Sequence, residues 1–133
     1  MNNKIKIYLA GGMKSGWQDT VINKLKNSCI FFNPQDHGLI NANEYKTWDL
    51  HFVNQADIIF AYLEKENPSG FGLTLEIGYA KALNKTIILV DERSINDSSF
   101  LNYFKIVRES ADVVFDDFES GLNFLERFSI YFV

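Results

Sequence analysis

Apolar residues follow two alternating patterns along the chain. Five short runs rich in Ile, Val, Phe and Leu are almost continuously apolar, which is typical of strands buried on both faces. These runs predict strands at residues 5–10, 29–32, 57–63, 86–90 and 113–115. The segments between them place apolar residues three and four positions apart, as amphipathic helices do. They predict helices at residues 17–26, 44–55, 70–83, 98–108 and 118–128, with loops at 34–43 and 65–69.

This alternation of strand and helix favours an α/β fold. Consecutive parallel strands need crossover helices, so the pattern predicts a five-stranded parallel sheet covered by helices on both faces. A chain of 133 residues is long enough for one domain, and no linker or repeat divides residues 1–133. In such sheets ligands bind at the carboxyl ends of the strands. Residues 11–13, 67–72 and 91–92 are predicted to lie at that edge.

A glutamate interrupts the apolar face of the helix predicted at residues 70–83. Residues three, four and seven apart share a helix face, so Glu76 lies on the same face as Leu73 and Ala80. A buried, unpaired carboxylate is costly, and is usually protonated, paired or used in chemistry. The small residues Gly72 and Ala80 leave room for a ligand to approach it. Glu76 is therefore a candidate nucleophile or general base.

Three other polar side chains are candidates for the same site, each with a simpler alternative. Asp49 sits near the inward face of the helix at 44–55, or at a boundary position where its carboxylate reaches water. Tyr8 is by default a core residue of the first strand, but its hydroxyl could hold the Glu76 carboxylate. His37, in the polar loop, is most simply solvent-exposed, or contacts a ligand from the rim.

Two adjacent glycines, Gly11 and Gly12, follow the first strand. Their spacing does not match the glycine-rich motif of dinucleotide-binding proteins. Glycines at this position allow the backbone to approach a ligand closely, whereas the alternative is a plain turn between strand and helix. The position at the carboxyl edge of the sheet is compatible with both interpretations.

Composition excludes several classes of function. The formal net charge of −4 argues against binding nucleic acid through its phosphates. A single cysteine, Cys29, excludes an internal disulfide and a cysteine-based metal cluster, and two histidines are too few for a zinc site. No apolar run is long enough to span a membrane, and the first residues lead into a strand pattern without a signal peptide. We therefore expect a cytoplasmic protein with no metal, no membrane association and no nucleic-acid partner.

Several segments, taken in order, resemble the nucleoside 2-deoxyribosyltransferase family. They are residues 7–12, 48–50, 56–59, 72–80, which read G-x-x-x-E-I-G-Y-A, and 84–88, within a match spanning roughly residues 4 to 92. The resemblance implies a flavodoxin-like (Rossmann-type) three-layer sandwich and a glutamate nucleophile, which is Glu76 here. It matches Asp49 to the family's helical aspartate and Tyr8 to the tyrosine of its first strand. Members assemble as dimers or larger oligomers, with a residue of a neighbouring subunit completing the site.

The chain departs from the family pattern in the loop before Glu76. The transferases carry an aspartate six residues before the nucleophile, where this chain has Gly70. The related deoxynucleoside 5′-monophosphate N-glycosidases carry a serine in this loop, and Ser69 lies one position away from it. They also use an arginine after the first strand, where this chain offers Lys14.

The resemblance therefore leaves three functions open. The first is a transferase that forms a covalent deoxyribosyl-Glu76 intermediate and passes the sugar to another base. The second is an N-glycosidase that hydrolyses nucleoside 5′-monophosphates, with Ser69, Gly70 and Lys14 receiving the phosphate. The third is a non-catalytic nucleotide-binding module, against which the presence of both Glu76 and Asp49 argues.

The expected ligands are a deoxynucleoside or nucleotide and a free nucleobase, with no cofactor. The residues expected to contact the substrate are Gly11, Gly12, Met13, Trp17, His37, Ser69, Gly70 and Gly72. Aromatic packing around Trp17 and Phe71 would exclude water from the site. The chain also has twelve phenylalanines, six tyrosines and an apolar stretch at residues 130–133. These apolar residues, together with the oligomeric assembly that the resemblance implies, favour a homo-oligomer, either a dimer or a multiple of one.

Overall fold

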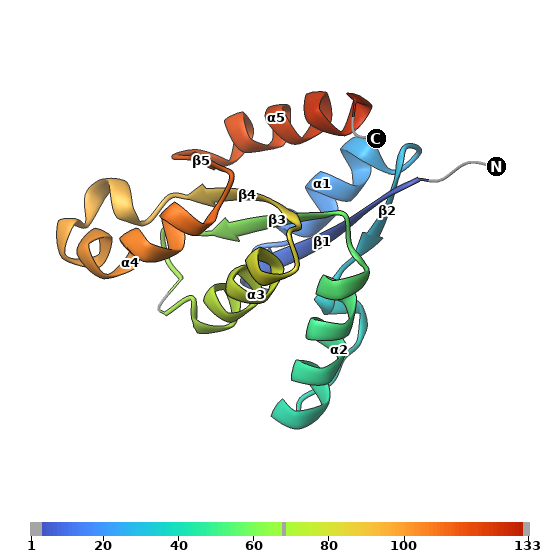
Figure 1. The fold of residues 1–133 in the computed structure, drawn as a ribbon, viewed down its shortest axis with the longest axis horizontal. Coiled ribbons are helices and arrows are strands. Elements are labelled where there is room, and N and C mark those ends of the chain that lie inside the picture. The colour runs from blue at the N-terminus through green and yellow to red at the C-terminus, as the bar shows by residue number, and fades with distance from the viewer. Residues whose placement is uncertain (1–3, 68, 132–133) are drawn as a thin grey trace.

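The computed structural model describes residues 4–67 and 69–131 of the chain. Its centre is a five-stranded sheet in the order β2-β1-β3-β4-β5, in which every neighbouring pair is parallel. The strands are β1 Ile5–Gly11, β2 Cys29–Phe32, β3 Ile58–Leu63, β4 Thr86–Asp91 and β5 Val113–Phe115 (Figure 1). The predicted α/β fold with a five-stranded parallel sheet is confirmed.

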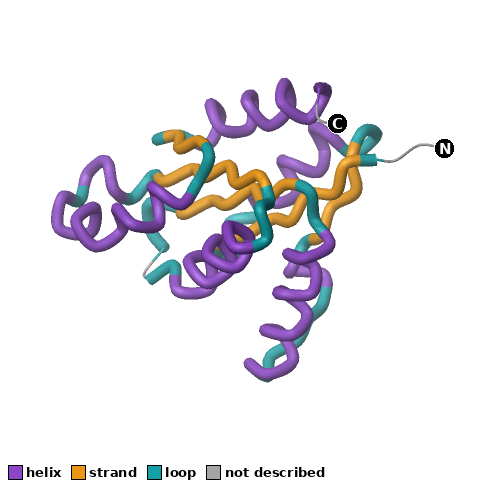
Figure 2. The backbone as a smooth tube through the Cα atoms, viewed as in Figure 1, coloured by secondary structure: helices purple, strands orange, loops and turns teal. Residues whose placement is uncertain are grey.

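Helices cover both faces of this sheet. They are α1 Trp17–Leu25, α2 Ala42–Gln55, α3 Phe71–Ala82, α4 Ser98–Ser110 and α5 Phe118–Tyr131, with 3₁₀ turns η1 Pro34–Asp36 and η2 Ser94–Asn96. In Figures 1 and 2, α1 and α5 lie above the sheet, and α2, α3 and α4 lie on the opposite side. None of the helices in the described part of the chain is long and apolar enough to cross a membrane.

The two faces of β1 supply two separate cores. Ile7 and Leu9 pack with residues of α1 and α5, whereas Tyr8 and Ala10 pack with residues of α3. Successive strand residues point to opposite faces, so the phenolic side chain of Tyr8 is directed to the α3 side of the sheet. This alternation brings a tyrosine of the first strand into the layer that contains Glu76.

The predicted elements agree with the observed ones to within a few residues, and the main difference lies in the loop expected at residues 34–43. This loop contains η1, and α2 begins at Ala42 rather than Glu44. The reason is local: the side chain of Asn33 accepts a hydrogen bond from the backbone N–H of Gln35, and that of Asn41 accepts one from Asn43. Such asparagine caps satisfy backbone donors that a helix start leaves without partners.

The chain runs from β1 outward to β2, and then crosses back to β3 on the other side of β1. The loops after β1 and β3 therefore diverge at the carboxyl edge of the sheet, which is where such folds bind ligands. Gly11 ends β1 with φ +147°, and a Cβ there would clash with the carbonyl oxygen of Tyr62 in β3. Glycine is required at this position because the neighbouring strand passes so close.

Candidate active site

The candidate site is built around Glu76, in the second turn of α3. Only 7% of this residue is exposed. The hydroxyl of the fully buried Tyr8 donates a hydrogen bond of 2.6 Å to its Oε2 atom. The contact expected between these two side chains is therefore present. It gives the carboxylate a fixed orientation and a strong, short donor.

Burial and charge set the protonation of this carboxyl group. Burial raises the pKa of Glu76 from 4.5 to about 8; the Tyr8 hydrogen bond opposes that shift, and the nearby Asp49 carboxyl adds to it. Burial also raises the pKa of Asp49, against the opposing effect of His37. Desolvation and the adjacent Glu76 raise the pKa of Tyr8, so its hydroxyl stays a donor. With a pKa of about 8, Glu76 keeps its proton near neutral pH, and the adjacent Asp49 carboxyl favours that protonated form.

Asp49 faces this pair from α2 and is accompanied by His37. The Nε2 atom of His37 lies 3.4 Å from Oδ1 of Asp49, and 9% of the histidine side chain is exposed. The interpretation of His37 as a solvent-exposed loop residue is therefore wrong. The turn after η1 folds it inward, its ring packs edge-on against Trp48, and the backbone N–H of Leu39 donates to its Nδ1 atom at 2.8 Å.

These side chains line a cavity of about 280 Å³ at the carboxyl edge of the sheet. Its walls are Gly11, Met13, Pro34, His37, Leu39, Tyr45, Asp49, Gly72, Leu73 and Glu76. It brings together six residues that the sequence singled out: Gly11, Met13, His37, Asp49, Gly72 and Glu76. A Cβ on Gly72 would meet no atom within 4 Å, so α3 is open to the cavity at that point.

Sequence reasoning missed four of the residues that line this cavity: Pro34, Leu39, Tyr45 and Leu73. Tyr45 is 40% exposed and lies at the cavity wall. The signal that could have found it is its position four residues before Asp49, on the same face of α2. Pro34 and Leu39 flank His37 in a segment whose fold depends on side-chain caps, which apolar periodicity does not report.

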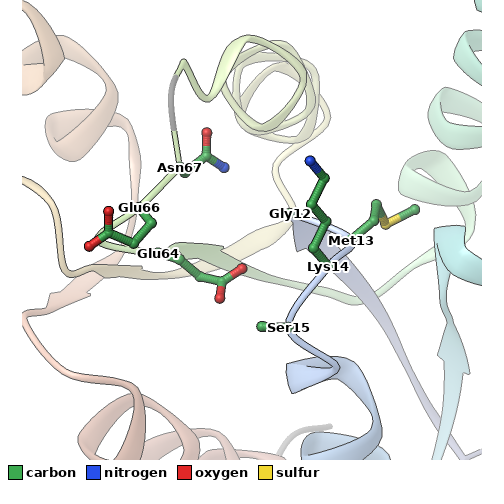
Figure 3. A pocket seen from close by; sticks show the side chains of 7 residues that line it. All are labelled: Gly12, Met13, Lys14, Ser15, Glu64, Glu66 and Asn67. Atoms are coloured by element: carbon green, nitrogen blue, oxygen red, sulfur yellow. The ribbon is translucent and has the colours of Figure 1, made fainter.

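A second cavity of about 520 Å³ adjoins the first. It is lined by Gly12, Met13, Lys14, Ser15, Glu64, Glu66 and Asn67, and Met13 belongs to both cavities. Figure 3 shows Glu64 and Glu66 on the segment after β3, across the cavity from the segment that carries Met13, Lys14 and Ser15. Its ionisable side chains are thus two carboxylates and one ammonium. Gly12, expected to contact substrate, lines this second cavity and not the first.

Three residues of the expected contact set line neither cavity: Trp17, Ser69 and Gly70. Trp17 is 5% exposed and packs edge-on against Tyr62, and its Nε1 atom donates to the carbonyl oxygen of Gly12. It belongs to the core on the α1 side of the sheet.

In the loop before α3, backbone donors are already bound by a side chain of the same loop. The backbone N–H groups of Ser69 and Gly70 both donate to Oδ1 of Asn67, at 3.1 and 3.0 Å. The guanidinium of Arg93 donates in turn to the carbonyl oxygen of Asn67 at 2.8 Å. Gly70 adopts φ +71° at the start of α3, a left-handed conformation that favours glycine. Phe71, expected to exclude water, is 82% exposed on the single chain.

Within residues 4–67 and 69–131, no group of three or more His, Cys, Asp or Glu side chains is placed to hold a metal ion. The polar groups of the first cavity are two carboxyls, a phenol and an imidazole. This set can transfer protons and can stabilise or attack a positively charged carbon centre.

Comparison with known proteins gives a family and a fold. A family model described as "Nucleoside 2-deoxyribosyltransferase like" matches residues 4–94. Among solved structures, a 2-desoxiribosyltransferase from Leishmania mexicana is similar with a TM-score of 0.70 and 19% identity, over 97% of this chain and 99% of that one. The search of curated protein sequences found no match.

Two further solved structures share the fold. A CMP N-glycosidase from Clostridium botulinum, BcmB, has a TM-score of 0.59 and 17% identity, over 92% of this chain and 98% of that one. The solution structure of BlsM has a TM-score of 0.63 and 18% identity, over 97% of this chain and 90% of that one. At these identities the likeness establishes the architecture.

Proposed function

The chain belongs to the family of nucleoside 2-deoxyribosyltransferase-like proteins, and from this premise we propose that it cleaves the N-glycosidic bond of 2′-deoxynucleosides and passes the sugar to another base. One observation carries the proposal: a buried glutamate, Glu76, is held by Tyr8 at 2.6 Å and shares a cavity with Asp49. A carboxylate with a fixed orientation beside a second carboxyl group is the arrangement that two-step glycosyl transfer needs.

In the first step an oxygen of the Glu76 carboxylate attacks C1′ of the deoxyribose. The C1′–N bond breaks, its electron pair stays on the base nitrogen, and Asp49 gives its proton to the departing base. The products are a deoxyribosyl ester of Glu76 and a free base. The transition state resembles an oxocarbenium ion, which is stabilised by the negative charge of the Glu76 carboxylate and by the charge that develops on Asp49.

In the second step an incoming base attacks C1′ through a ring nitrogen. Its ring proton passes to the Asp49 carboxylate, and the ester bond breaks to restore the Glu76 carboxylate. Two successive displacements return the sugar in its original configuration.

The first step sets a requirement on the protonation of the two carboxyl groups. The reaction needs Glu76 ionised and Asp49 protonated, which is one proton shared by two carboxyl groups. The Tyr8 hydrogen bond favours the ionised form of Glu76, and burial favours the protonated form of Asp49. Because the pKa of Glu76 is raised to about 8, the proton has to pass from Glu76 to Asp49 before the first step, and the Tyr8 hydrogen bond to the ionised Glu76 favours that transfer.

Product analysis tests the proposal. The protein is incubated with a deoxynucleoside and a different free base, and the products are separated by chromatography. A new deoxynucleoside supports transfer, free base alone indicates hydrolysis, and no product contradicts both. Without an acceptor, intact mass should show one deoxyribosyl group on the wild type and none on Glu76→Ala. Glu109→Ala, which alters an exposed glutamate of α4, is the matched control.

Hydrolysis of deoxynucleoside 5′-monophosphates is a second candidate, and Lys14 favours it. Its ammonium lines the cavity next to the site, where it could meet a phosphate. Two features oppose it: Glu64 and Glu66 line the same cavity, and the N–H groups of Ser69 and Gly70 are already bound by Asn67. We therefore place the unphosphorylated nucleoside first. Comparing base release from a nucleoside and its 5′-monophosphate separates the two.

We also propose that the protein acts as a homo-oligomer. Phe71 and Leu75 on α3, and Tyr103 and Ile106 on α4, are large apolar side chains that are all more than half exposed on the single chain. Apolar surface of this kind is a liability unless it is covered, and a second copy of the chain is the simplest cover.

A further inference from the structure

The wall of the first cavity formed by His37 and Asp49 constrains which base can bind. We propose that these two side chains select nucleobases that present two neighbouring hydrogen-bond acceptors on one edge. The inference rests on the proposed function, because it takes Asp49 as the proton donor to the departing base. It adds a specificity-determining role for His37.

The first observation is the position of the His37 proton. The backbone N–H of Leu39 donates to Nδ1 at 2.8 Å, so this nitrogen is an acceptor and carries no proton. In the neutral ring the proton then lies on Nε2, which is a donor. Nε2 is the nitrogen on the side of Asp49, and His37 lines the cavity.

The second observation is that His37 and Asp49 lie side by side without a hydrogen bond between them. Oδ1 of Asp49 is inaccessible to solvent, and within the described residues it makes no hydrogen bond, although Nε2 of His37 lies 3.4 Å away. Oδ1 is closed off from the cavity, but Asp49 lines the cavity, so its carboxyl group presents its other oxygen to a bound base, while the Nε2–H group of His37 is not used by Oδ1. When Asp49 is protonated to act as general acid, this side of the site offers two donors next to each other.

Two adjacent donors match some bases and clash with others. The 6-oxopurines, hypoxanthine and guanine, present the acceptors N7 and O6 on one edge, whereas adenine presents N7 beside an amino group. Among the pyrimidines, cytosine presents O2 and N3 as acceptors, whereas in uracil the N3 position carries a proton. A donor that meets another donor leaves both without a hydrogen bond in a buried site, which lowers binding strongly.

The test compares bases of equal ring size, so that cavity volume does not affect the outcome. Base release is measured for deoxyinosine against deoxyadenosine and for deoxycytidine against deoxyuridine. We expect kcat/KM to favour the first member of each pair by about tenfold or more, the discrimination that one mismatched contact produces. A wild type that prefers deoxyadenosine or deoxyuridine overturns the inference. If the protein cleaves only purine or only pyrimidine deoxynucleosides, the comparison within that class tests the inference.

Variants assign the preference to His37 rather than to the intrinsic lability of the bonds. In His37→Gln the amide can turn either its oxygen or its nitrogen toward the base, so both ratios should approach one. His51→Gln makes the same change on an exposed histidine of α2 that does not line the cavity, and should keep the wild-type ratios. Unchanged ratios in a folded His37→Gln protein also overturn the inference.

Binding of free bases distinguishes failure of this inference from failure of the proposed function. Calorimetry on the wild type at mildly acidic pH compares hypoxanthine with adenine and cytosine with uracil. If no nucleoside is cleaved, the proposed function is wrong. The affinities for the free bases then show whether the site prefers bases with two neighbouring acceptors. If nucleosides are cleaved but the kcat/KM ratios favour deoxyadenosine or deoxyuridine, the proposed function is supported and the inference is wrong.

Discussion

The hydroxyl of Tyr8 donates a 2.6 Å hydrogen bond to Oε2 of Glu76, joining two residues that are 68 positions apart in sequence. The contact follows from two simple periodicities. Alternation along β1 turns Tyr8 toward the α3 layer, and helical spacing in α3 turns Glu76 back toward the sheet. Because both residues are buried, the bond forms away from water, where a hydrogen bond to a charged group is strong.

Replacing Tyr8 by Phe removes this donor and leaves the ring in place. The ionised form of Glu76 then loses the hydrogen bond that stabilises it. We therefore expect kcat to fall by about 10- to 100-fold, as for loss of one hydrogen bond to a charged group. The pKa of Glu76 should rise further, which moves the acid limb of the rate profile to higher pH. Steady-state base release as a function of pH checks both effects. A rate and profile like those of the wild type would remove Tyr8 from this role.

The elements could be predicted because their signals are local. Continuous apolar runs and three-to-four spacing identified all five strands and five helices that residues 4–67 and 69–131 form. The early start of α2 was missed because it depends on the Asn41 side chain, a capping contact that apolar periodicity does not contain. Element boundaries near polar loops are set by such individual hydrogen bonds.

The candidate site was partly predictable for the same reason. Glu76 was identified from its position on one helix face, which requires no knowledge of distant contacts. The position of Trp17 was not predictable, because strands that are apolar on both faces do not reveal which side receives a neighbouring helix. The inward turn of His37 was missed because it depends on a 2.8 Å contact with the Leu39 backbone and on packing against Trp48.

Replacing Asp49 by Asn should slow base departure, because an amide cannot give a proton to the leaving base. We expect a loss of about 10²- to 10⁴-fold in kcat, the range for removal of a general acid. Deoxynucleosides whose bases leave readily without protonation should lose less. The measurement is a comparison of kcat across substrates with different leaving bases. An equal loss with every base would show that Asp49 acts in another way.

Assembly can be tested at two apolar surfaces. Deleting residues 130–133 tests the tail, of which Ile130 and Tyr131 are 69% and 81% exposed and Phe132 and Val133 lie outside the described residues. Tyr103→Lys tests α4, where Tyr103 is 84% exposed. A charge in a contact between copies should lower the assembly constant, because interface cores exclude charged residues.

Sedimentation over a range of concentrations measures this effect, together with activity per subunit on dilution. Lys105→Glu places a charge change on α4 without altering an apolar side chain, and is the control. A wild type that is monomeric and fully active at all concentrations would contradict the homo-oligomer proposal.

Replacing Glu76 by Gln should stabilise the folded protein, and more so at higher pH. The pKa of Glu76 is raised on folding from 4.5 to about 8, so the folded state binds the proton more tightly than the unfolded state. The stability that this proton supplies is complete below about pH 4.5, and it is lost as the pH rises toward 8. Glutamine resembles the protonated acid in shape and charge, and its amide oxygen can still accept from Tyr8.

Thermal unfolding of the wild type and Glu76→Gln at about pH 5 and about pH 8.5 measures this difference. One pKa unit corresponds to about 1.4 kcal/mol, so the advantage of the variant should grow by an amount on the order of a few kcal/mol between the two conditions. For a domain of this size, each kcal/mol moves Tm by about 2–8 °C. Glu109→Gln removes an exposed carboxylate of α4 and corrects for the change in net charge. If the difference in Tm between Glu76→Gln and the wild type is the same at both pH values, the raised pKa of Glu76 is contradicted, and with it the shared proton on which the proposed chemistry depends.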